Sequence, residues 1–135
     1  MDKRRGLRVL MVADMSEPAA VLAVHVRADG HDVVLAADSR SALAAAQTAL
    51  PDVVFLDLDL PGLDADALTK QIQSFSSWRR PLLIVLSEGE QEPRRAQPAG
   101  IDLHLVKPVD LDMLQRLLQR FQAIVQDIEG FDPVI

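Results

Sequence analysis

The feature that most constrains the fold is a short, unbroken apolar run, Val53-Val54-Phe55-Leu56, which is followed directly by Asp57. Turn residues bound the run, with Pro51 before it and Pro61-Gly62 after it. A short apolar run between turn signals is typical of a strand that is buried on both faces of a parallel sheet. Open α/β sheets place their ligand crevice at the carboxyl ends of such strands. We therefore expect Asp57 to serve chemistry and to be poorly suited to burial.

Strand-like and helix-like segments alternate along the rest of the chain. The expected strands cover 7–12, 33–35, 53–56, 82–86 and 101–106, and the expected helices begin at the caps Ser16, Asp38 or Ser39, Asp64 and Asp110. Strands joined by crossovers of this length predict a parallel sheet with helices on both faces. Residues 88–99 contain two prolines and almost no large apolar side chain. We therefore expect a short or distorted helix between the fourth and fifth strands.

The bulk composition excludes several classes of protein. The chain has 135 residues, no cysteine and a formal net charge of -6. The lack of cysteine excludes disulfides and thiolate metal sites and fits a reducing cytoplasm. An acidic balance argues against sequence-independent nucleic-acid binding, which needs a basic face. No stretch approaches the roughly 18 apolar residues of a membrane span, and the apolar stretch after the basic start is too short and too charged for a signal peptide, because Arg8 interrupts it and Asp14 closes it. We expect one cytoplasmic domain over 1–135, with a core at about 7–128, that binds neither membrane nor nucleic acid.

Four polar side chains stand where expected strands end. Asp14 follows the first strand, Asp57 the third, Ser87 the fourth and Lys107 the last. Because the carboxyl ends of parallel strands meet at one edge of a sheet, we expect these groups in one crevice. Carboxylate oxygens suit a hard cation such as Mg²⁺, and an ammonium beside a hydroxyl suits a phosphoryl group. A carboxylate with a cation beside it can itself act as the nucleophile toward a phosphoryl donor, giving an aspartyl phosphate.

Four segments at these strand ends carry a resemblance to a known family. They are Val9-Leu10-Met11-Val12-Ala13-Asp14, Asp57-Leu58-Asp59-Leu60-Pro61-Gly62, Ile84-Val85-Leu86-Ser87 and Lys107-Pro108. Their order and spacing resemble the receiver domain of bacterial two-component response regulators, of the chemotaxis-regulator kind. The resemblance implies a flavodoxin-like, doubly wound α/β fold with a five-stranded parallel sheet in the order 2-1-3-4-5. It also implies a phosphorelay module rather than a metabolic enzyme. Its implied partners are a sensor histidine kinase or phosphotransfer protein and a downstream protein or fused module.

The resemblance implies a role for each residue of the crevice. Asp57 would accept the phosphoryl group in a magnesium-dependent reaction. The carboxylates of Asp14 and Asp57 and the backbone carbonyl of Asp59 would hold Mg²⁺. Lys107 would pair with the phosphate, across a cis peptide bond to Pro108, since proline lowers the cost of that isomer.

The resemblance also implies that two further residues change the protein surface after phosphorylation. Ser87 would turn its hydroxyl onto the phosphate, and His104 would occupy the aromatic switch position on the last strand. The family usually has Tyr or Phe there, and unlike them histidine titrates near neutral pH. The surface that changes would comprise the segment after Ser87, the last strand and the final helix.

Besides His104, three departures from the family pattern bear on these roles. Ala13 stands where the family usually has a second acid, which weakens the electrostatic hold on Mg²⁺. Asp59 could return a carboxylate to the crevice, a hypothesis that fails if Asp59→Asn leaves Mg²⁺ affinity unchanged. Glu88 adds negative charge beside Ser87. The short segment after Ser87 belongs to the surface through which many receivers dimerise, so at most a weak homodimer is expected.

Two other functions compete with the phosphoacceptor. A pseudo-receiver would keep the fold and bind partners without phosphorylation, because Ala13 replaces a metal-binding acid. A phosphatase that forms an aspartyl phosphate typically carries a second acid two residues after the nucleophile, as in Asp57-Leu58-Asp59. In such enzymes, however, the nucleophile normally follows the first strand.

The final helix shows the clearest amphipathic pattern of the chain. Its apolar residues recur at steps of three and four, which predicts a face packed on the sheet: Leu111, Leu114, Leu118, Phe121, Val125 and Ile128. A thinner second stripe of Met113, Leu117 and Ile124 is a candidate partner surface. His25 and His31 have no neighbours at metal-ligand spacing, and we assign them no site.

Overall fold

The computed structural model describes residues 6–14, 16–75, 80–89 and 100–129, and the side chains as far as residue 127. Five strands and four helices follow one another in these segments. They are β1 (Arg8–Val12), α1 (Glu17–Ala28), β2 (Asp32–Ala36), α2 (Ser39–Ala49), β3 (Val53–Asp57), α3 (Ala65–Ser74), β4 (Leu82–Glu88), β5 (Leu103–Lys107) and α4 (Leu111–Glu129). Of the segment 88–99, for which a short helix was expected, residues 90–99 lie outside the described residues and Glu88 belongs to β4.

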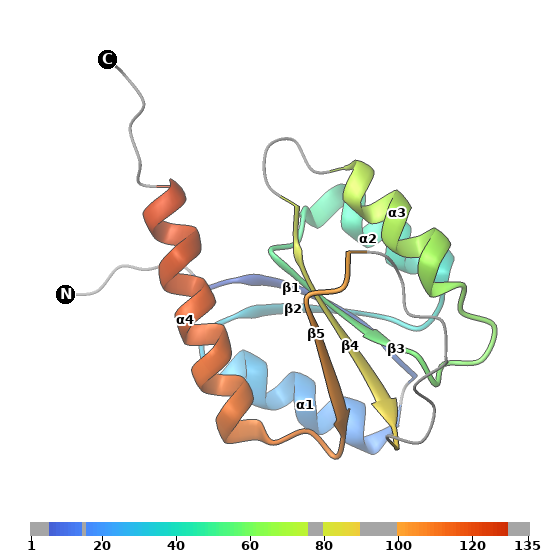
Figure 1. Cartoon of the computed structure of the whole chain (residues 1–135), viewed down its shortest axis with the longest axis horizontal. Helices are drawn as coiled ribbons and strands as arrows, with labels where there is room; N and C mark the ends of the chain where they lie inside the picture. Colours follow the sequence, from blue (N-terminus) through green and yellow to red (C-terminus); the bar gives the residue numbers. More distant parts are fainter. Residues whose placement is uncertain (1–5, 15, 76–79, 90–99, 130–135) are drawn as a thin grey trace.

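The five strands form one parallel sheet (Figure 1). Their order is β2-β1-β3-β4-β5, so the predicted flavodoxin-like topology is confirmed. The chain reverses its winding direction after β2, and β1 and β3 are neighbours at that point. Such a reversal opens a crevice at the carboxyl ends of the two central strands.

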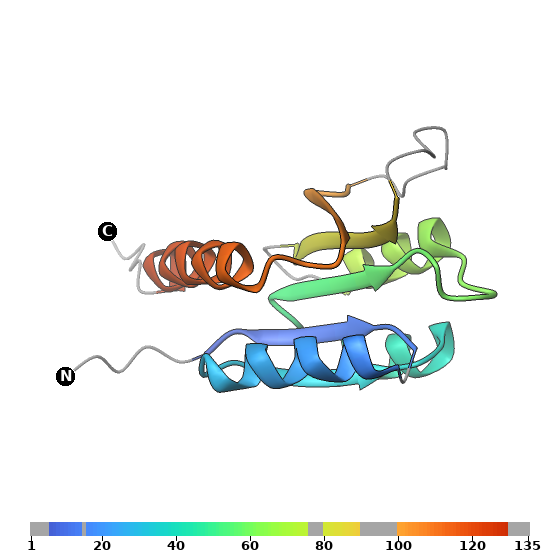
Figure 2. The same cartoon turned by 90° about the horizontal axis from the view of Figure 1, so that it is seen from below.

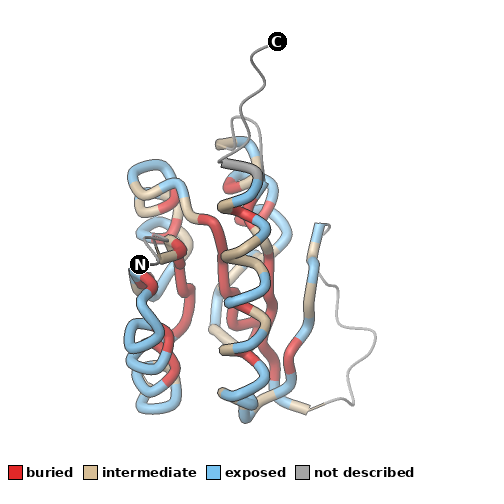
Figure 3. Tube along the Cα trace, turned by 90° about the vertical axis from the view of Figure 1, so that its left-hand side faces the viewer, coloured by how far each residue is buried: buried red, intermediate tan, exposed pale blue. Residues whose placement is uncertain are grey.

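The helices cover the two faces of the sheet in pairs (Figures 1 and 2). One core cluster joins β-strand residues to α1 and α4, through Leu22, Val26 and Leu118. A second cluster joins the opposite face to α2 and α3, through Ala46 and Leu68. Figure 3 shows the buried residues concentrated along the strands between the helices. All five residues of β3 are buried, as an unbroken apolar run on a central parallel strand requires.

Side-chain caps start the helices where the sequence predicts them. Ser16 accepts a hydrogen bond from the backbone N–H of Ala19 at the start of α1, and Asp38 caps α2 in the same way. Asp64 caps α3, and Asp110 accepts from the N–H of Met113 at 3.1 Å in α4. Each cap satisfies a backbone donor that has no partner inside its helix.

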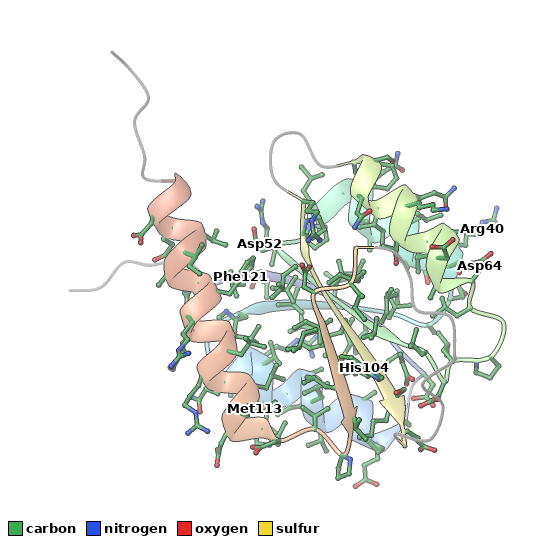
Figure 4. All side chains as sticks on the ribbon, in the orientation of Figure 1. Arg40, Asp52, Asp64, His104, Met113 and Phe121 are labelled. Carbon is green, nitrogen blue, oxygen red and sulfur yellow. The ribbon has the colours of Figure 1, made fainter. Side chains whose placement is uncertain are left out.

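The final helix packs as its periodicity predicts. Leu114, Leu118 and Val125 are buried in the first core cluster, and Phe121 packs against it. Figure 4 shows Phe121 and Met113 on this helix, and Met113 and Ile124 of the second stripe are exposed. Within the described part of the chain, no helix has the length and apolar character needed to cross a membrane.

The fourth strand is longer than the sequence pattern indicates. It continues through Ser87 and Glu88, which pair with Val106 and Lys107 of β5. Polar residues can extend a strand when a neighbouring strand supplies the backbone hydrogen bonds. The pairing fixes where the side chains of Ser87 and Lys107 lie with respect to β3.

Candidate functional site

The carboxyl ends of β3, β4 and β5 bring the predicted residues together. Asp57 pairs in register with Leu86, and Glu88 pairs with Lys107. Asp57 and Lys107 therefore lie on strands that flank β4 on its two sides, at the same edge of the sheet. The lysine side chain spans β4 to reach the aspartate, which is the contact that organises the crevice.

Asp57 is buried, with only 5% of its surface exposed, so the expectation that it would resist burial was wrong. Three hydrogen bonds to its carboxylate compensate for the loss of water. Lys107 Nζ lies 2.9 Å from Oδ1 and 2.9 Å from Oδ2, and the backbone N–H of Asp59 donates to Oδ1 at 2.9 Å. A buried carboxylate is tolerated when a cation and donors replace its hydration.

Lys107 serves two carboxylates at once. Besides Asp57, its Nζ lies 3.2 Å from Oδ2 of Asp59. Partial burial alone would lower the pKa of Lys107, but the hydrogen bonds to Asp57 and Asp59 outweigh it and raise that pKa above its ordinary value. The ammonium is therefore charged at neutral pH. The peptide bond from Lys107 to Pro108 is cis, as predicted.

Asp59 ties the loop after β3 to the end of β4. Its Oδ2 accepts the backbone N–H of Glu88 at 2.8 Å, in addition to the contact with Lys107. The sequence placed the Asp59 carboxylate in this crevice only as a hypothesis, and the Glu88 N–H was not foreseen. A backbone donor leaves no signal in the residue types, so only the extension of β4 reveals it.

Asp14 lies at the outer side of the crevice and is exposed. Hydrogen bonds from Ser16 hold the pKa of Asp14 below its usual value, and Lys107 contributes in the same direction. Asp14, Asp57 and Lys107 line one pocket of about 910 Å³. The pocket also borders apolar side chains of α1 and of the start of α4, among them Val21 and Leu111.

The oxygen donors of this pocket suit a magnesium ion. Mg²⁺ is usually bound by one or two carboxylates and keeps several waters, and Asp14 and Asp57 supply two carboxylates to the same pocket. Across the described residues, no group of three or more His, Cys, Asp or Glu side chains could hold a metal ion. A metal here would depend on few protein ligands and on water, in keeping with the loss of an acid at Ala13. That alanine is itself buried, with 3% exposure.

Ser87 and His104 are joined directly. The hydroxyl of Ser87 lies 2.5 Å from Nε2 of His104, between adjacent strands. His104 pairs in register with Val85, two residues before Ser87, so both side chains lie on one face of the sheet. Figure 4 shows His104 on β5 beside β4. The sequence proposed both residues as a switch but did not predict their hydrogen bond.

Comparison with known proteins decides the family. The family model of the response regulator receiver domain matches residues 9–119. The chain belongs to this family. As a receiver domain it is a signalling module of two-component systems. Functional residues were predicted from the sequence at the carboxyl ends of the strands, and the crevice lies there.

Two curated relatives illustrate how this receiver domain relates to longer proteins. It is 36% identical over 110 residues to the transcriptional regulatory protein TcrA of Mycobacterium tuberculosis, covering 81% of this chain and 43% of TcrA. It is 29% identical over 126 residues to the response regulator PleD of Caulobacter vibrioides, covering 90% of this chain and 28% of PleD. The chain thus spans less than half of the length of either relative.

A solved structure shows the same fold. The receiver domain of the sensor histidine kinase PA1611 from Pseudomonas aeruginosa PAO1 superposes with a TM-score of 0.75 at 31% identity. The match covers 87% of this receiver domain and 98% of the other chain. That protein holds a magnesium ion coordinated in its active site cleft.

Proposed function

We propose that this receiver domain accepts a phosphoryl group on Asp57 from a phosphohistidine of a sensor kinase or phosphotransfer protein. The contact of Lys107 Nζ with both oxygens of Asp57, at 2.9 Å each, carries this proposal. A buried carboxylate whose oxygens are held by a cation and a backbone donor is a nucleophile in place. It lies on a pocket wide enough to admit a phosphoryl donor.

The transfer is a substitution at phosphorus. An oxygen of Asp57 forms a new bond to phosphorus, and the bond from phosphorus to the donor histidine nitrogen breaks. The imidazole leaves with the electron pair and takes a proton from water. Lys107 neutralises the charge that gathers on the phosphoryl oxygens, and the N–H of Asp59 holds the attacking carboxylate in position.

Magnesium, where it binds, neutralises phosphoryl charge and orients the transferring group. In this proposal Asp14, Asp57 and the backbone carbonyl of Asp59 hold it. Hydrogen bonds from Ser16 lower the pKa of Asp14, which favours its carboxylate form as a ligand. The magnesium-bound relative, at 31% identity, supports this cofactor.

The signal leaves the crevice through Ser87 and His104. In the proposal the Ser87 hydroxyl turns from His104 toward the phosphoryl group, and His104 then changes its own position on β5. The hydrogen bond between the two side chains supports a direct coupling. The surface that responds would include β5 and α4, and a downstream protein or a fused module would read it. This relay would operate in the cytoplasm. That compartment is reducing, and a chain without cysteine forms no disulfide that would need an oxidising one.

One experiment tests the phosphoacceptor. The protein is incubated with Mg²⁺ and acetyl phosphate, and mass spectrometry looks for an adduct that is acid-stable and base-labile. The expected result is one phosphoryl group per chain, absent in Asp57→Asn and without Mg²⁺. An adduct that persists in Asp57→Asn would place the acceptor elsewhere.

The burial of Ala13 in place of an acid favours a second candidate, the pseudo-receiver. Such a protein would bind its partners without phosphorylation. The same incubation separates the two functions, because a pseudo-receiver forms no adduct across a wide range of Mg²⁺ concentration. Steady release of phosphate from many monoesters would instead indicate a phosphatase.

A further inference from the structure

The ammonium group of Lys107 has no spare donor for a phosphoryl group. A lysine ammonium carries three N–H donors. Three carboxylate oxygens surround Lys107 Nζ, namely both oxygens of Asp57 at 2.9 Å and Oδ2 of Asp59 at 3.2 Å. Each new anion that pairs with Lys107 must therefore displace one of these contacts.

The same oxygen of Asp59 accepts a hydrogen bond from a second donor, close to the proposed phosphoacceptor Asp57. Oδ2 accepts the Glu88 backbone N–H at 2.8 Å, and Glu88 is the residue after Ser87 on β4. Lys107 and this N–H thus converge on one carboxylate oxygen, next to Asp57. A phosphoryl group on Asp57 would be a more highly charged anion at the same place, where its oxygens need donors of this kind.

We propose that the Asp59 carboxylate occupies the anion position beside Asp57 and competes with the incoming phosphoryl group for Lys107 and the Glu88 N–H. This inference rests on the proposed phosphoryl transfer to Asp57. Asp59 is a positioning residue that slows the reaction, because it must turn away before transfer. It also holds the end of β4 to the loop after β3 until that moment.

The loop geometry fixes the main chain of Asp59 but lets its side chain rotate. Its backbone N–H donates to Asp57 Oδ1 at 2.9 Å, so the main chain stays fixed on the acceptor. Its side chain is partly exposed, at 28%, and can rotate toward the pocket without breaking that backbone bond. The residue therefore acts through its carboxylate alone, and a substitution that keeps its shape isolates the effect.

The test compares Asp59→Asn with a matched control of equal charge change. Asp66→Asn serves as control, because Asp66 lies on α3 and forms an exposed ion pair with Lys70 at 3.2 Å. Phosphorylation by acetyl phosphate is followed at saturating Mg²⁺. We expect Asp59→Asn to react about three- to fivefold faster than the wild type. This ratio corresponds to the free energy of one partly exposed ion pair. The control should stay near the wild-type rate.

A second substitution shows whether Lys107 transmits the effect. In a Lys107→Met background, Asp59→Asn should no longer accelerate the reaction, because the contested donor is gone. An adduct that forms in the wild type but no faster in Asp59→Asn than in Asp66→Asn would overturn the inference and leave the proposed function standing.

If neither wild type nor variant forms an adduct, the proposed function fails, and anion binding decides the inference. Sulfate is then titrated into each protein, and the Glu88 amide signal is followed by nuclear magnetic resonance. We expect Asp59→Asn to bind sulfate about threefold more tightly than Asp66→Asn, again by one partly exposed ion pair. Equal affinities would overturn the competition.

Discussion

The two ends of the sheet both pair acids with bases, but in different proportions. At the amino ends, Asp52 accepts the N–H of Arg8 at 2.8 Å and pairs with the Arg8 side chain at 3.4 Å. Asp102 accepts the N–H of Leu83 at 2.8 Å and pairs with Arg80 at 2.6 Å. Each acid there has its own arginine and its own backbone donor. Figure 4 places Asp52 at the end of the sheet opposite the tips of β4 and β5.

At the carboxyl ends, by contrast, one lysine pairs with two carboxylates. Lys107 pairs with Asp57 and Asp59, and Asp14 and Glu88 line the same pocket. The surplus of negative charge makes this end costly to hold together and ready to bind a cation. Paired groups that balance one another stabilise the fold, whereas an unbalanced cluster is retained for chemistry.

The largest predicted contrast is between the buried acids of the two ends. Asp52→Ala should lower the free energy of unfolding by about 3 kcal/mol, because it leaves the backbone N–H of Arg8 without this acceptor. Asp57→Ala should cost less than about 1 kcal/mol, since Lys107 keeps Asp59 and one of two crowded carboxylates is gone. Urea unfolding of the two variants measures both values.

Arg8→Met is the control for this contrast. The Arg8 side chain is 43% exposed, so its removal should cost no more than about 1 kcal/mol while the backbone bond to Asp52 remains. Equal losses in Asp52→Ala and Asp57→Ala would contradict the distinction between a structural and a chemical end of the sheet.

At the carboxyl end, we expect the loss of Lys107 to lower the free energy of unfolding more than the loss of Asp57 does. Lys107→Met leaves Asp57 buried without a cation and should cost about 2 kcal/mol. The double variant Lys107→Met, Asp57→Asn should recover most of this loss, because no buried charge then remains. Urea unfolding of the single and double variants completes the cycle. A double variant as unstable as Lys107→Met alone would mean that the lysine acts through its packing.

The contrast also explains what the sequence could predict. The parallel sheet, the helix caps and the meeting of Asp57 with Lys107 follow from local patterns and from the geometry of parallel sheets, whereas the strand order was implied by the resemblance to the receiver family. The caps need only one side chain and the N–H three residues later, so Ser16 and Asp64 are visible in the sequence. Lys107 is found because it ends a strand, and all parallel strands end at one edge.

Contacts that depend on register between distant strands could not be predicted. Asp52 and Asp102 lie at strand starts and look like ordinary loop acids in the sequence, yet each accepts a backbone N–H from another strand. The hydrogen bond between Ser87 and His104 depends on the pairing of β4 with β5. The burial of Asp57 depends on the lysine that crosses β4 to reach it.

His31 at the amino end provides the smallest predicted effect and the sharpest test of pH dependence. It is buried, and its Nδ1 accepts the N–H of Leu7 at 2.9 Å, which only an unprotonated Nδ1 can do. Burial lowers the pKa of His31, although Asp29 and Asp32 oppose the shift. Its stabilising contribution is complete above the unfolded value of 6.5. It is lost as pH falls below that value, because the unfolded chain binds a proton that the folded chain does not.

The variant His31→Asn isolates this titration. Its Oδ1 is the same number of bonds from Cα as Nδ1 of histidine, so it can accept the Leu7 N–H at every pH. Urea midpoints measured between pH 7.5 and 5.5 should fall more steeply for the wild type than for the variant. His25 and His104 are present in both proteins, so they do not account for a difference between the two slopes. Parallel slopes would show that His31 is protonated in the folded state too, and that the amino end tolerates a charge there.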